Sequence, residues 1–583
     1  MKRVLFFVLI LILPLNVFAQ TAQPGFDLTQ YGVRIEPDKR LIAVLATLEA
    51  AGMETTLTAD GAKFRQKLQA DLKDTDPELR RKIKIFIDQY KRRHPNTTNA
   101  ETLTPFISMA YTLSPVPDLT DPTRTTDLPG DLLEVLDFAP LVREFYRRAL
   151  SAKFDEYVKD YQKAGEQLRP STVEMVSELL EYLHTKPQLT YIEKIKTASS
   201  PTKDKKKPLE KIEIRERARR FFIVPEMLAA KGTINFLNIG DDYYAIVPPE
   251  TDLSASETRR AFLQFVLDPL VLKNAKEIST FREGIRGLLD ERRKSNPDIS
   301  PDVFLAVLRS LVAAADAKEI EFRKTRVGTA QARNKIDRMK TVEEKKAVSA
   351  ELEAFKKSLA DETALQLSEA YEKGAVLAFY FAEQLKGSED AGFDIASSLR
   401  DMILSLNTTK ETNRLAQFAD ARRRSLAARE GRRKNANTEE IIVENPVTKK
   451  LLDIDKITQT KNYAQAETEL KKLLEANSSE SRIYYALGRV ASLSAESITD
   501  TETRNRRLLD AKVAYENVIR SATTKTDSTL LFLTYVALAR LYEYSGDDGY
   551  AIKLYETALK FGDATSNAYK EVIAARERLV KEQ

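Results

Sequence analysis

Few side chains of this chain could act as a nucleophile or as a metal ligand. The sequence has no cysteine and only two histidines, His94 and His184. A Ser-His-Asp or Cys-His set needs a histidine beside its nucleophile, and both histidines stand in helix-end contexts that favour a surface position. No G-x-x-x-x-G-K-[ST] or G-x-G-x-x-G loop for phosphates occurs. The sequence therefore predicts no catalytic residue, no metal and no cofactor.

Carboxylates are the remaining candidates for acid–base chemistry. The pairs Asp241–Asp242 and Asp547–Asp548 lie in predicted turns, where acidic residues are common for structural reasons. The two acids of a glycosidase can, however, be far apart in a chain. A carboxylate-dependent hydrolase acting on peptide or glycan therefore stays open as an alternative.

One helical segment has the spacing of a zinc-peptidase helix. It follows a predicted β-hairpin and reads ETRRAFLQFVLDPLVLKNAKEI from Glu257 to Ile278. The segment resembles the HExxH helix of zinc metallopeptidase-like proteins, and more narrowly that of a family of secreted bacterial proteins of unknown function. The resemblance extends over residues 27–290 and includes the segments YGVRIEPDKRLIAVLATLEAAG, ISMAYTLSPVPDL and FAPLVREFYRRAL.

The residues at the aligned positions depart from the zinc motif. Arg260 and Gln264 stand where the two histidine ligands would be, and Ala261 stands where the general-base glutamate would be. Arginine does not ligate zinc and alanine accepts no proton, so the resemblance implies a peptidase-like domain without its metal site. The alternative is an unrelated α+β domain in which residues 262–267 simply pack in the core.

A second pattern lies near the end of the chain, in YVALARLYEYSGDDGYAIKLYETA. Its regular positions are Tyr535, Leu538, Ala539 and Tyr542 on one predicted helix, Gly546 in a turn, and Ala551, Tyr555 and Ala558 on the next helix. This arrangement of small and aromatic residues resembles a tetratricopeptide repeat (TPR), a helical hairpin that stacks on its neighbours.

Two weaker units precede this one. The nearer has Tyr484, Leu487 and Gly488, then a polar insertion (SITDTETRNRR), then Ala511, Tyr515 and Val518; the earlier has Ile457, Ala466, Leu470 and Leu473. The segment 567–581 is expected to be a capping helix. The resemblance implies a groove lined by the first helix of each unit. The groove candidates are Arg482, Tyr485, Arg489, Arg540 and Tyr544.

The first residues predict export. Lys2 and Arg3 precede a short apolar run, Val4–Leu15, and small residues stand near Gln20. This is the pattern of a secretory signal peptide, predicted at 1–19, and the run is too short for a membrane span. The expected location is periplasmic or extracellular, with no transmembrane span.

The charge distribution argues against nucleic acid as a partner. The net charge is only +5 on 583 residues. Two basic clusters stand out, at 198–210 and at 422–434. Both are interpreted as solvated segments rather than as sites for anionic partners, since isolated charge runs usually are.

The helix and strand signals divide the rest of the chain. A strand is expected at 32–37, an Asp38-capped helix follows to Ala51, and a hairpin is expected within 219–247 around Gly240–Asp241. Ser254 and Glu257 are expected to form a capping box, and Pro269 to kink or end the helix that follows. Further helices are expected at 61–73, 77–93, 99–113, 131–168 (long or broken) and 171–184, and throughout 301–433 without a long coiled coil.

The sequence thus predicts a mainly α protein with a small β hairpin or sheet. The expected order is a signal peptide (1–19), a peptidase-like α+β domain (27–290), a helical extension (301–433) and a TPR solenoid (447–583). The predicted function is noncatalytic binding of a protein or peptide in the TPR groove, in an envelope complex. The alternatives are the hydrolase named above and a purely structural spacer.

Overall fold

The computed structural model describes residues 25–122, 130–197, 211–392, 394–434, 446–564 and 566–582. The structure is mainly helical, with 71% helix and 6% strand. It divides into two compact units: residues 28–453, and residues 454–582 together with 25–27. The predicted signal peptide and the basic segment 198–210 lie outside the described residues.

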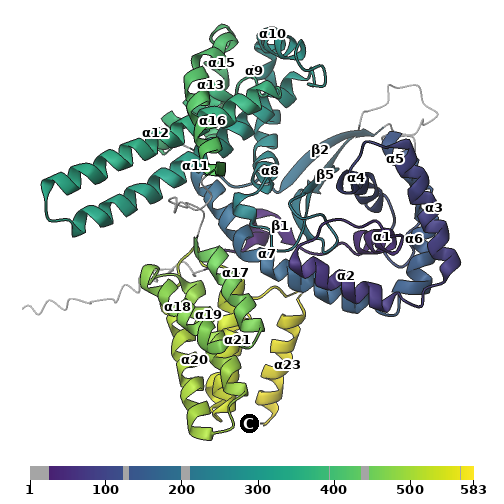
Figure 1. Ribbon diagram of the computed structural model, residues 1–583, viewed down its shortest axis with the longest axis vertical. Helices are drawn as coiled ribbons and strands as arrows, with labels where there is room; N and C mark the ends of the chain where they lie inside the picture. The colour runs from purple at the N-terminus through teal and green to yellow at the C-terminus, as the bar shows by residue number, and fades with distance from the viewer. Residues whose placement is uncertain are drawn as a thin grey trace, which may run out of the picture. The chain divides into compact units, whose positions relative to one another are not determined.

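A four-stranded sheet stands at the centre of the larger unit (Figure 1). Its order is β1 (Val33–Ile35), β4 (Arg220–Pro225), β6 (Asp242–Val247) and β5 (Asn235–Ile239). The first three strands are parallel, and β5 runs antiparallel to β6. The predicted hairpin and the predicted strand at 32–37 are therefore confirmed, and Gly240 takes the positive φ of +62° that the hairpin turn needs.

A second, two-stranded sheet was not expected from the sequence. It pairs β2 (Thr190–Thr197) with β3 (Lys211–Ala218) in antiparallel register. Strand β3, KIEIRERA, alternates isoleucine with charged residues. It therefore lacks the apolar run by which the strands of the central sheet were recognised in the sequence. The sequence predicted strands only at 32–37 and within 219–247, so this second sheet was missed.

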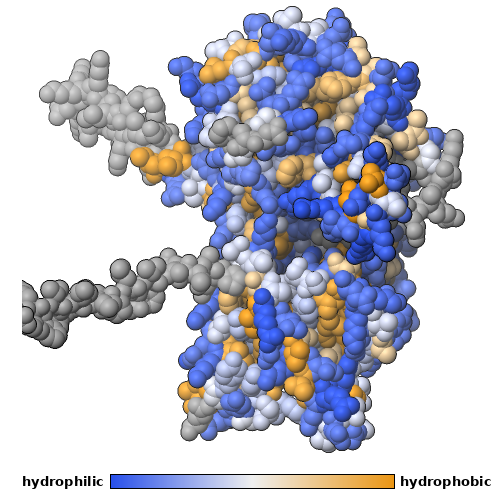
Figure 2. Space-filling view, turned by 90° about the vertical axis from the view of Figure 1, so that its left-hand side faces the viewer, coloured by the Kyte–Doolittle hydropathy of each residue, from blue (hydrophilic) through white to orange (hydrophobic). Residues whose placement is uncertain are grey.

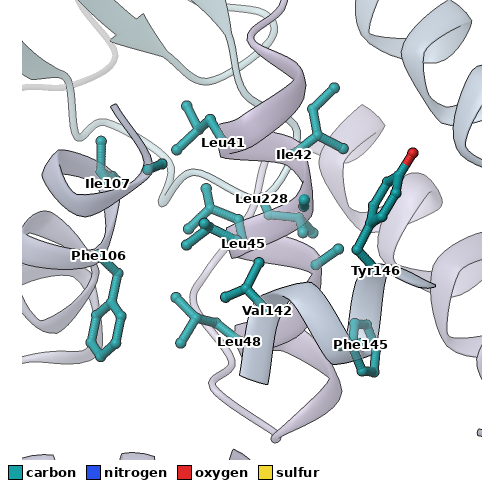
Figure 3. Close-up of a cluster of buried hydrophobic side chains, with 14 of the residues drawn as sticks. Leu41, Ile42, Leu45, Leu48, Phe106, Ile107, Val142, Phe145, Tyr146 and Leu228 are labelled. Carbon is teal, nitrogen blue, oxygen red and sulfur yellow. The ribbon is translucent and has the colours of Figure 1, made fainter. Parts of the chain in front are cut away.

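The N-terminal helices enclose a hydrophobic core beside the sheet. Figure 3 shows side chains from α1, α4 and α6 meeting there with Leu228 from the end of β4. Asp38 caps α1 as predicted, accepting from the backbone N–H groups of Arg40 and Leu41. The helices are α1 (Lys39–Ala50), α2 (Ala59–Asp71), α3 (Pro77–Arg93), α4 (Asn99–Ala110), α5 (Gly130–Leu136), α6 (Ala139–Phe145), the π-helical turn η2 (Tyr146–Leu150) and α7 (Phe154–Leu183), with the 3₁₀ turn η1 (Leu28–Tyr31) before β1.

The expected break between the helices at 131–168 and 171–184 is absent, and Pro269, which was expected to kink or end its helix, does not end it. Helix α7 continues through Pro170, and α8 (Thr258–Lys273) continues through Pro269. A proline inside a helix costs about 3 kcal/mol, and burial of one long face of α7 offsets that cost. At Gly165 this helix comes so close to the sheet that a Cβ would lie 3.3 Å from Ile35 Cγ2.

The expected capping box before α8 is also wrong. Ser254 lies in a 3₁₀ turn, η3 (Leu253–Ala255), whose cap is Asp252. Glu257 precedes α8 but makes no side-chain capping bond. The Ser254 carbonyl instead accepts a hydrogen bond from the buried guanidinium of Arg259, at 3.3 Å. The turn therefore contacts α8 through the buried Arg259 side chain and does not cap the first N–H groups of the helix.

Helices continue to the end of the larger unit. They are α9 (Ala275–Thr280), α10 (Arg282–Arg293), α11 (Val303–Arg338), α12 (Val342–Glu372), α13 (Ala378–Ala391), α14 (Ile395–Leu404), the 3₁₀ turn η4 (Thr408–Asn413), α15 (Arg414–Gln417) and α16 (Ala419–Lys434). Helices α11 and α12 form an antiparallel pair (Figure 1). The chain turns between them where Thr341 begins α12 with a capping box. Helix α11 also packs against α8, so the predicted domains 27–290 and 301–433 share one compact unit.

The smaller unit consists of helices in succession, and from α19 onward each packs on the one before. They are α17 (Pro446–Gln459, which begins in the larger unit), α18 (Tyr463–Ala476), α19 (Ser481–Glu496), α20 (Thr501–Ser521), α21 (Ser528–Tyr544), α22 (Asp548–Ala558) and α23 (Asn567–Glu582). The polar insertion is largely helical, because its residues 501–507 form the first turns of α20. Phe26 joins this unit through its backbone, with its N–H donating to the Thr526 carbonyl at 2.6 Å.

On the face shown in Figure 2, hydrophilic residues predominate and hydrophobic residues lie in separate patches. Among the described helices, none combines the length and the apolar character that a membrane crossing requires.

Candidate functional site

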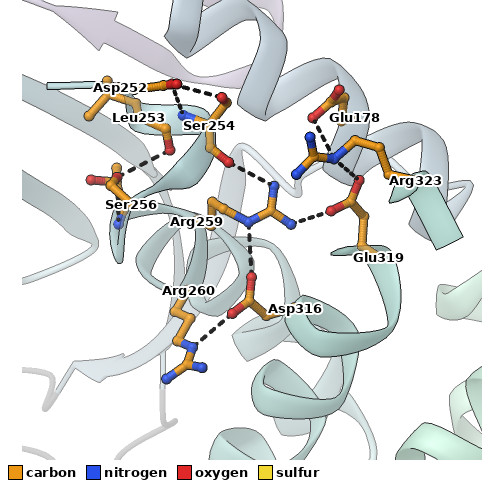
Figure 4. Close-up of polar contacts among 11 residues, drawn as sticks. Glu178, Asp252, Leu253, Ser254, Ser256, Arg259, Arg260, Asp316, Glu319 and Arg323 are labelled. Atoms are coloured by element: carbon orange, nitrogen blue, oxygen red, sulfur yellow. Dashed lines mark hydrogen bonds and ion pairs between the residues drawn. The ribbon is translucent and has the colours of Figure 1, made fainter. Parts of the chain in front are cut away.

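The start of α8, where the zinc motif was aligned, is occupied by an ion-pair network (Figure 4). Arg259 is 3% exposed and donates to Asp316 Oδ1 at 3.0 Å and to Glu319 Oε2. Burial opposes its charged form, but Glu319 and Asp316 outweigh that effect and raise the pKa of Arg259. The centre of this site is therefore a residue that the alignment with the zinc motif left out.

The three aligned positions lie at the rim of this network. Arg260 donates to Asp316 Oδ2 at 2.8 Å and is 49% exposed. Ala261 and Gln264 are half-buried on the same helix. Within the described residues, no group of three or more His, Asp or Glu side chains is placed to hold a metal ion. The chemistry of this site is thus charge pairing between α8 and α11.

The network reaches α7 through a second arginine. Arg323 Nε lies 3.4 Å from Glu178 Oε2 and 3.4 Å from Glu319 Oε1. Burial raises the pKa of Glu178 to about 7, against the opposing effect of Arg323. The network therefore links α7, α8 and α11 through buried and half-buried charges.

A second buried polar site lies at the carboxyl end of β4. Glu226 is fully buried, and its Oε1 accepts from the Tyr161 hydroxyl at 2.6 Å and from the Leu228 N–H at 3.0 Å. Its Oε2 has no partner among the described atoms. Burial raises the pKa of Glu226 to about 7, although both hydrogen bonds oppose the shift. This carboxyl group is therefore about half protonated at neutral pH and largely protonated below it.

Sequence reasoning did not single out Glu226. The signal was present, since a glutamate interrupts the apolar run FFIVPEML. A charged residue in a buried strand end is uncommon unless it is paired or neutral. The site is closed by the core around it, and it lacks the open cleft that a catalytic carboxylate would need to reach a substrate.

The five predicted groove residues differ in their exposure and in whether they already have a partner within the fold. Arg482 pairs with Glu480 at 2.9 Å, and Arg489 pairs with Asp455 at 2.6 Å. Tyr485 is half-buried and packs on Tyr515, with ring centroids 5.7 Å apart.

The remaining two lie on α21 and face solvent. Tyr544 is 60% exposed. Arg540 is also exposed, and no carboxylate among the described residues lies within ion-pair distance of it. Of the five candidates, these two are therefore the ones available to a ligand.

Three arginines of the second basic cluster are paired with carboxylates of α12. Arg424 and Arg429 of α16 pair with Asp361 and Glu362 of α12, at 2.7 and 2.6 Å. Arg422 pairs with Glu372 at 2.7 Å in the same way. Arg422, Arg424 and Arg429 thus join α16 to α12 and are already engaged. No family model, curated protein or solved structure matches the chain.

Proposed function

We propose that this protein is an exported, noncatalytic scaffold that binds a protein or peptide through a short C-terminal TPR array, as part of an envelope complex. Residues 27–290, in this proposal, are a peptidase-like domain without a metal site, and residues 301–433 are a helical extension.

The observation that carries the proposal is a repeated burial pattern. The second helix of each proposed repeat buries three residues at spacings of four and three. These residues are Ala466, Leu470 and Leu473 on α18, Ala511, Tyr515 and Val518 on α20, and Ala551, Tyr555 and Ala558 on α22. Helical hairpins that stack as a solenoid need such a recurring face, because each unit covers its neighbour.

The first helices support the same register. Gly488 lies so close to Tyr515 that a Cβ would meet the ring at 2.6 Å, and Ala539 is fully buried at the corresponding position. Arg489 and Arg540 directly follow these small residues. They therefore occupy equivalent places on α19 and α21, on the side that lines the groove of a TPR array.

The free residues suggest what the groove accepts. Among the described residues Arg540 has no carboxylate partner, whereas the equivalent Arg489 has Asp455. Tyr544 stands one turn beyond Arg540 and is exposed. Arginine with tyrosine is typical of binding hot spots. The groove is suited to a peptide that places a carboxylate on Arg540 and an apolar side chain on Tyr544.

A peptide-binding experiment tests this proposal. A random peptide library is selected on the full chain, and binders are measured by fluorescence anisotropy. Acidic peptides are expected to bind, and Arg540→Glu is expected to weaken them at least about tenfold. Arg520→Glu is the control, because Arg520 lies on α20, a second helix, and is 72% exposed. Equal affinity in wild type and Arg540→Glu contradicts the proposal.

The alternative hydrolase predicts a different result. It requires an open cleft with two acids whose pKa values differ. Glu226 is instead fully buried, and the half-buried Glu178 lies beside Arg323, with both pKa values raised to about 7. Metal content of the purified chain, with thermal unfolding in added zinc, separates the two. Stoichiometric zinc that raises the melting temperature would favour the enzyme.

A further inference from the structure

An open cavity of about 400 Å³ lies between α10 and the start of α11, in the larger unit. Arg282 and Arg286 form one wall, and the segment from Ser300 to Phe304 forms the other. The volume is in the range of small-molecule sites in proteins. No residue singled out in the sequence lies there, and the cavity is separate from the ion-pair network on α8.

The two arginines project from the same side of α10, since they are four residues apart on a helix. Both are exposed, and neither has a carboxylate within ion-pair distance among the described residues. The later arginines of the same helix differ. Arg293 lies 3.7 Å from Asp290, and Arg292 lies over the ring of Tyr371 at 5.5 Å. The helix thus engages its last two arginines and leaves the two at the cavity available.

The opposite wall offers a hydroxyl donor and an apolar surface. Ser300 Oγ accepts from the Asp302 N–H at 3.3 Å, which leaves its own proton available to a ligand. Asp302 is already used as the cap of α11, where one oxygen accepts from the N–H groups of Phe304 and Leu305. The helix N-terminus is therefore satisfied internally, and the anion-binding capacity of the cavity comes from the arginines and Ser300.

We propose that this cavity binds a small oxyanion, a phosphate ester or a carboxylate, that carries a flat apolar group. The guanidinium groups of Arg282 and Arg286 bind the oxyanion, since forked donors suit both phosphate and carboxylate. The half-buried ring of Phe304, with Pro301 beside it, receives the apolar group. The site lies in the unit of residues 28–453 and does not depend on the proposed TPR groove.

Titration of defined probes into the full chain tests the proposal. Phenyl phosphate, benzoate and inorganic phosphate are each measured by isothermal calorimetry at low salt. One saturable site is expected for phenyl phosphate or for benzoate, and whichever binds more tightly identifies the natural oxyanion as a phosphate or a carboxylate. Inorganic phosphate is expected to bind at least about tenfold more weakly than phenyl phosphate, because it lacks the group that contacts Phe304.

Variants connect the binding to the cavity. The double variant Arg282→Gln/Arg286→Gln is expected to lose at least about tenfold in affinity for the tighter probe. Arg293→Gln is the matched control on the same helix, and it is expected to bind as wild type does. All three positions are on the surface, so the variants should fold, which circular dichroism checks. Absence of saturable binding by all probes, or unchanged binding in the double variant, overturns the proposal.

Discussion

Arg489 Nη1 lies 2.6 Å from Asp455 Oδ1, and the two residues are 34 positions apart in the chain. Asp455 follows Ile454 on α17 as Arg489 follows Gly488 on α19, so the ion pair joins equivalent positions of two successive first helices. A separation of 34 residues is the period of a TPR. The pair therefore supports the proposed repeat register independently of the buried positions on the second helices.

Removing this carboxylate should release a second groove cation. In Asp455→Asn, Arg489 loses its partner and joins Arg540 as an available guanidinium. Because the Arg489 side chain is 49% exposed, stability should change by less than about 1 kcal/mol. Affinity for acidic peptides selected on the wild type should rise. A fall in affinity would show that Asp455 itself contacts the peptide, which contradicts the proposed role of the pair.

Arg259 should be far more important for stability than its neighbour. Arg259→Met leaves Asp316 and Glu319 buried without their main partner, which costs about 3–5 kcal/mol for a buried pair. Arg260→Met is the control, because Arg260 is half-exposed and Asp316 keeps Arg259. Urea unfolding followed by circular dichroism measures both. Equal losses in the two variants would contradict the arrangement in Figure 4.

Glu226 should make stability depend on pH near neutrality. Its pKa is about 7 in the fold and near the ordinary value of 4.5 when unfolded, so the folded state holds the proton more tightly. The contribution of Glu226 to the free energy of unfolding is fully present below pH 4.5, and it is lost as the pH rises through 7. The loss amounts to roughly 3 kcal/mol, since each pKa unit corresponds to 1.36 kcal/mol.

The substitution Glu226→Gln isolates this contribution. Glutamine keeps the shape but does not titrate, so the variant should be more stable than the wild type at pH 8 and similar to it at pH 5. Glu178→Gln should remove a separate part of the pH dependence, because burial also raises the pKa of Glu178 to about 7. Urea unfolding at both pH values measures each part. Identical pH profiles for wild type and Glu226→Gln would mean that the carboxyl group is ionised throughout.

Local patterns in the sequence predicted much of the fold. The Asp38 cap, the hairpin turn at Gly240 and the extent of α3 follow from residues that act on their immediate neighbours. The failures came where tertiary packing decides. Pro170 and Pro269 remain inside helices, because the packing of α7 and α8 outweighs a local penalty.

The sites were harder to predict for the same reason. Arg259 and Asp316 are 57 residues apart, and no local pattern brings them together. The basic cluster around Arg424 looks available in the sequence, but its partner Asp361 lies on another helix. Arg282 and Arg286 differ from Arg292 of the same helix in what the fold places beside them, since Arg292 lies over the ring of Tyr371. Charge in a sequence therefore identifies candidates, and only the fold shows which of them are already paired.

Gly488 should be intolerant of even one added methyl group. A Cβ there would lie 2.6 Å from Tyr515 Cε1, and Tyr515 is itself buried with 3% exposure. Since neither the helix backbone nor the ring has room to move freely, Gly488→Ala should destabilise the smaller unit by about 1–3 kcal/mol. Gly387→Ala is the control, because Gly387 is an exposed residue in helix α13 with no atom within 4 Å of its Cβ position. The Gly387→Ala change should stabilise the larger unit by up to about 1 kcal/mol, because alanine has a higher helix propensity than glycine. Thermal unfolding of both variants checks the signs, and a stabilising Gly488→Ala would refute close contact of α19 and α20 at this position.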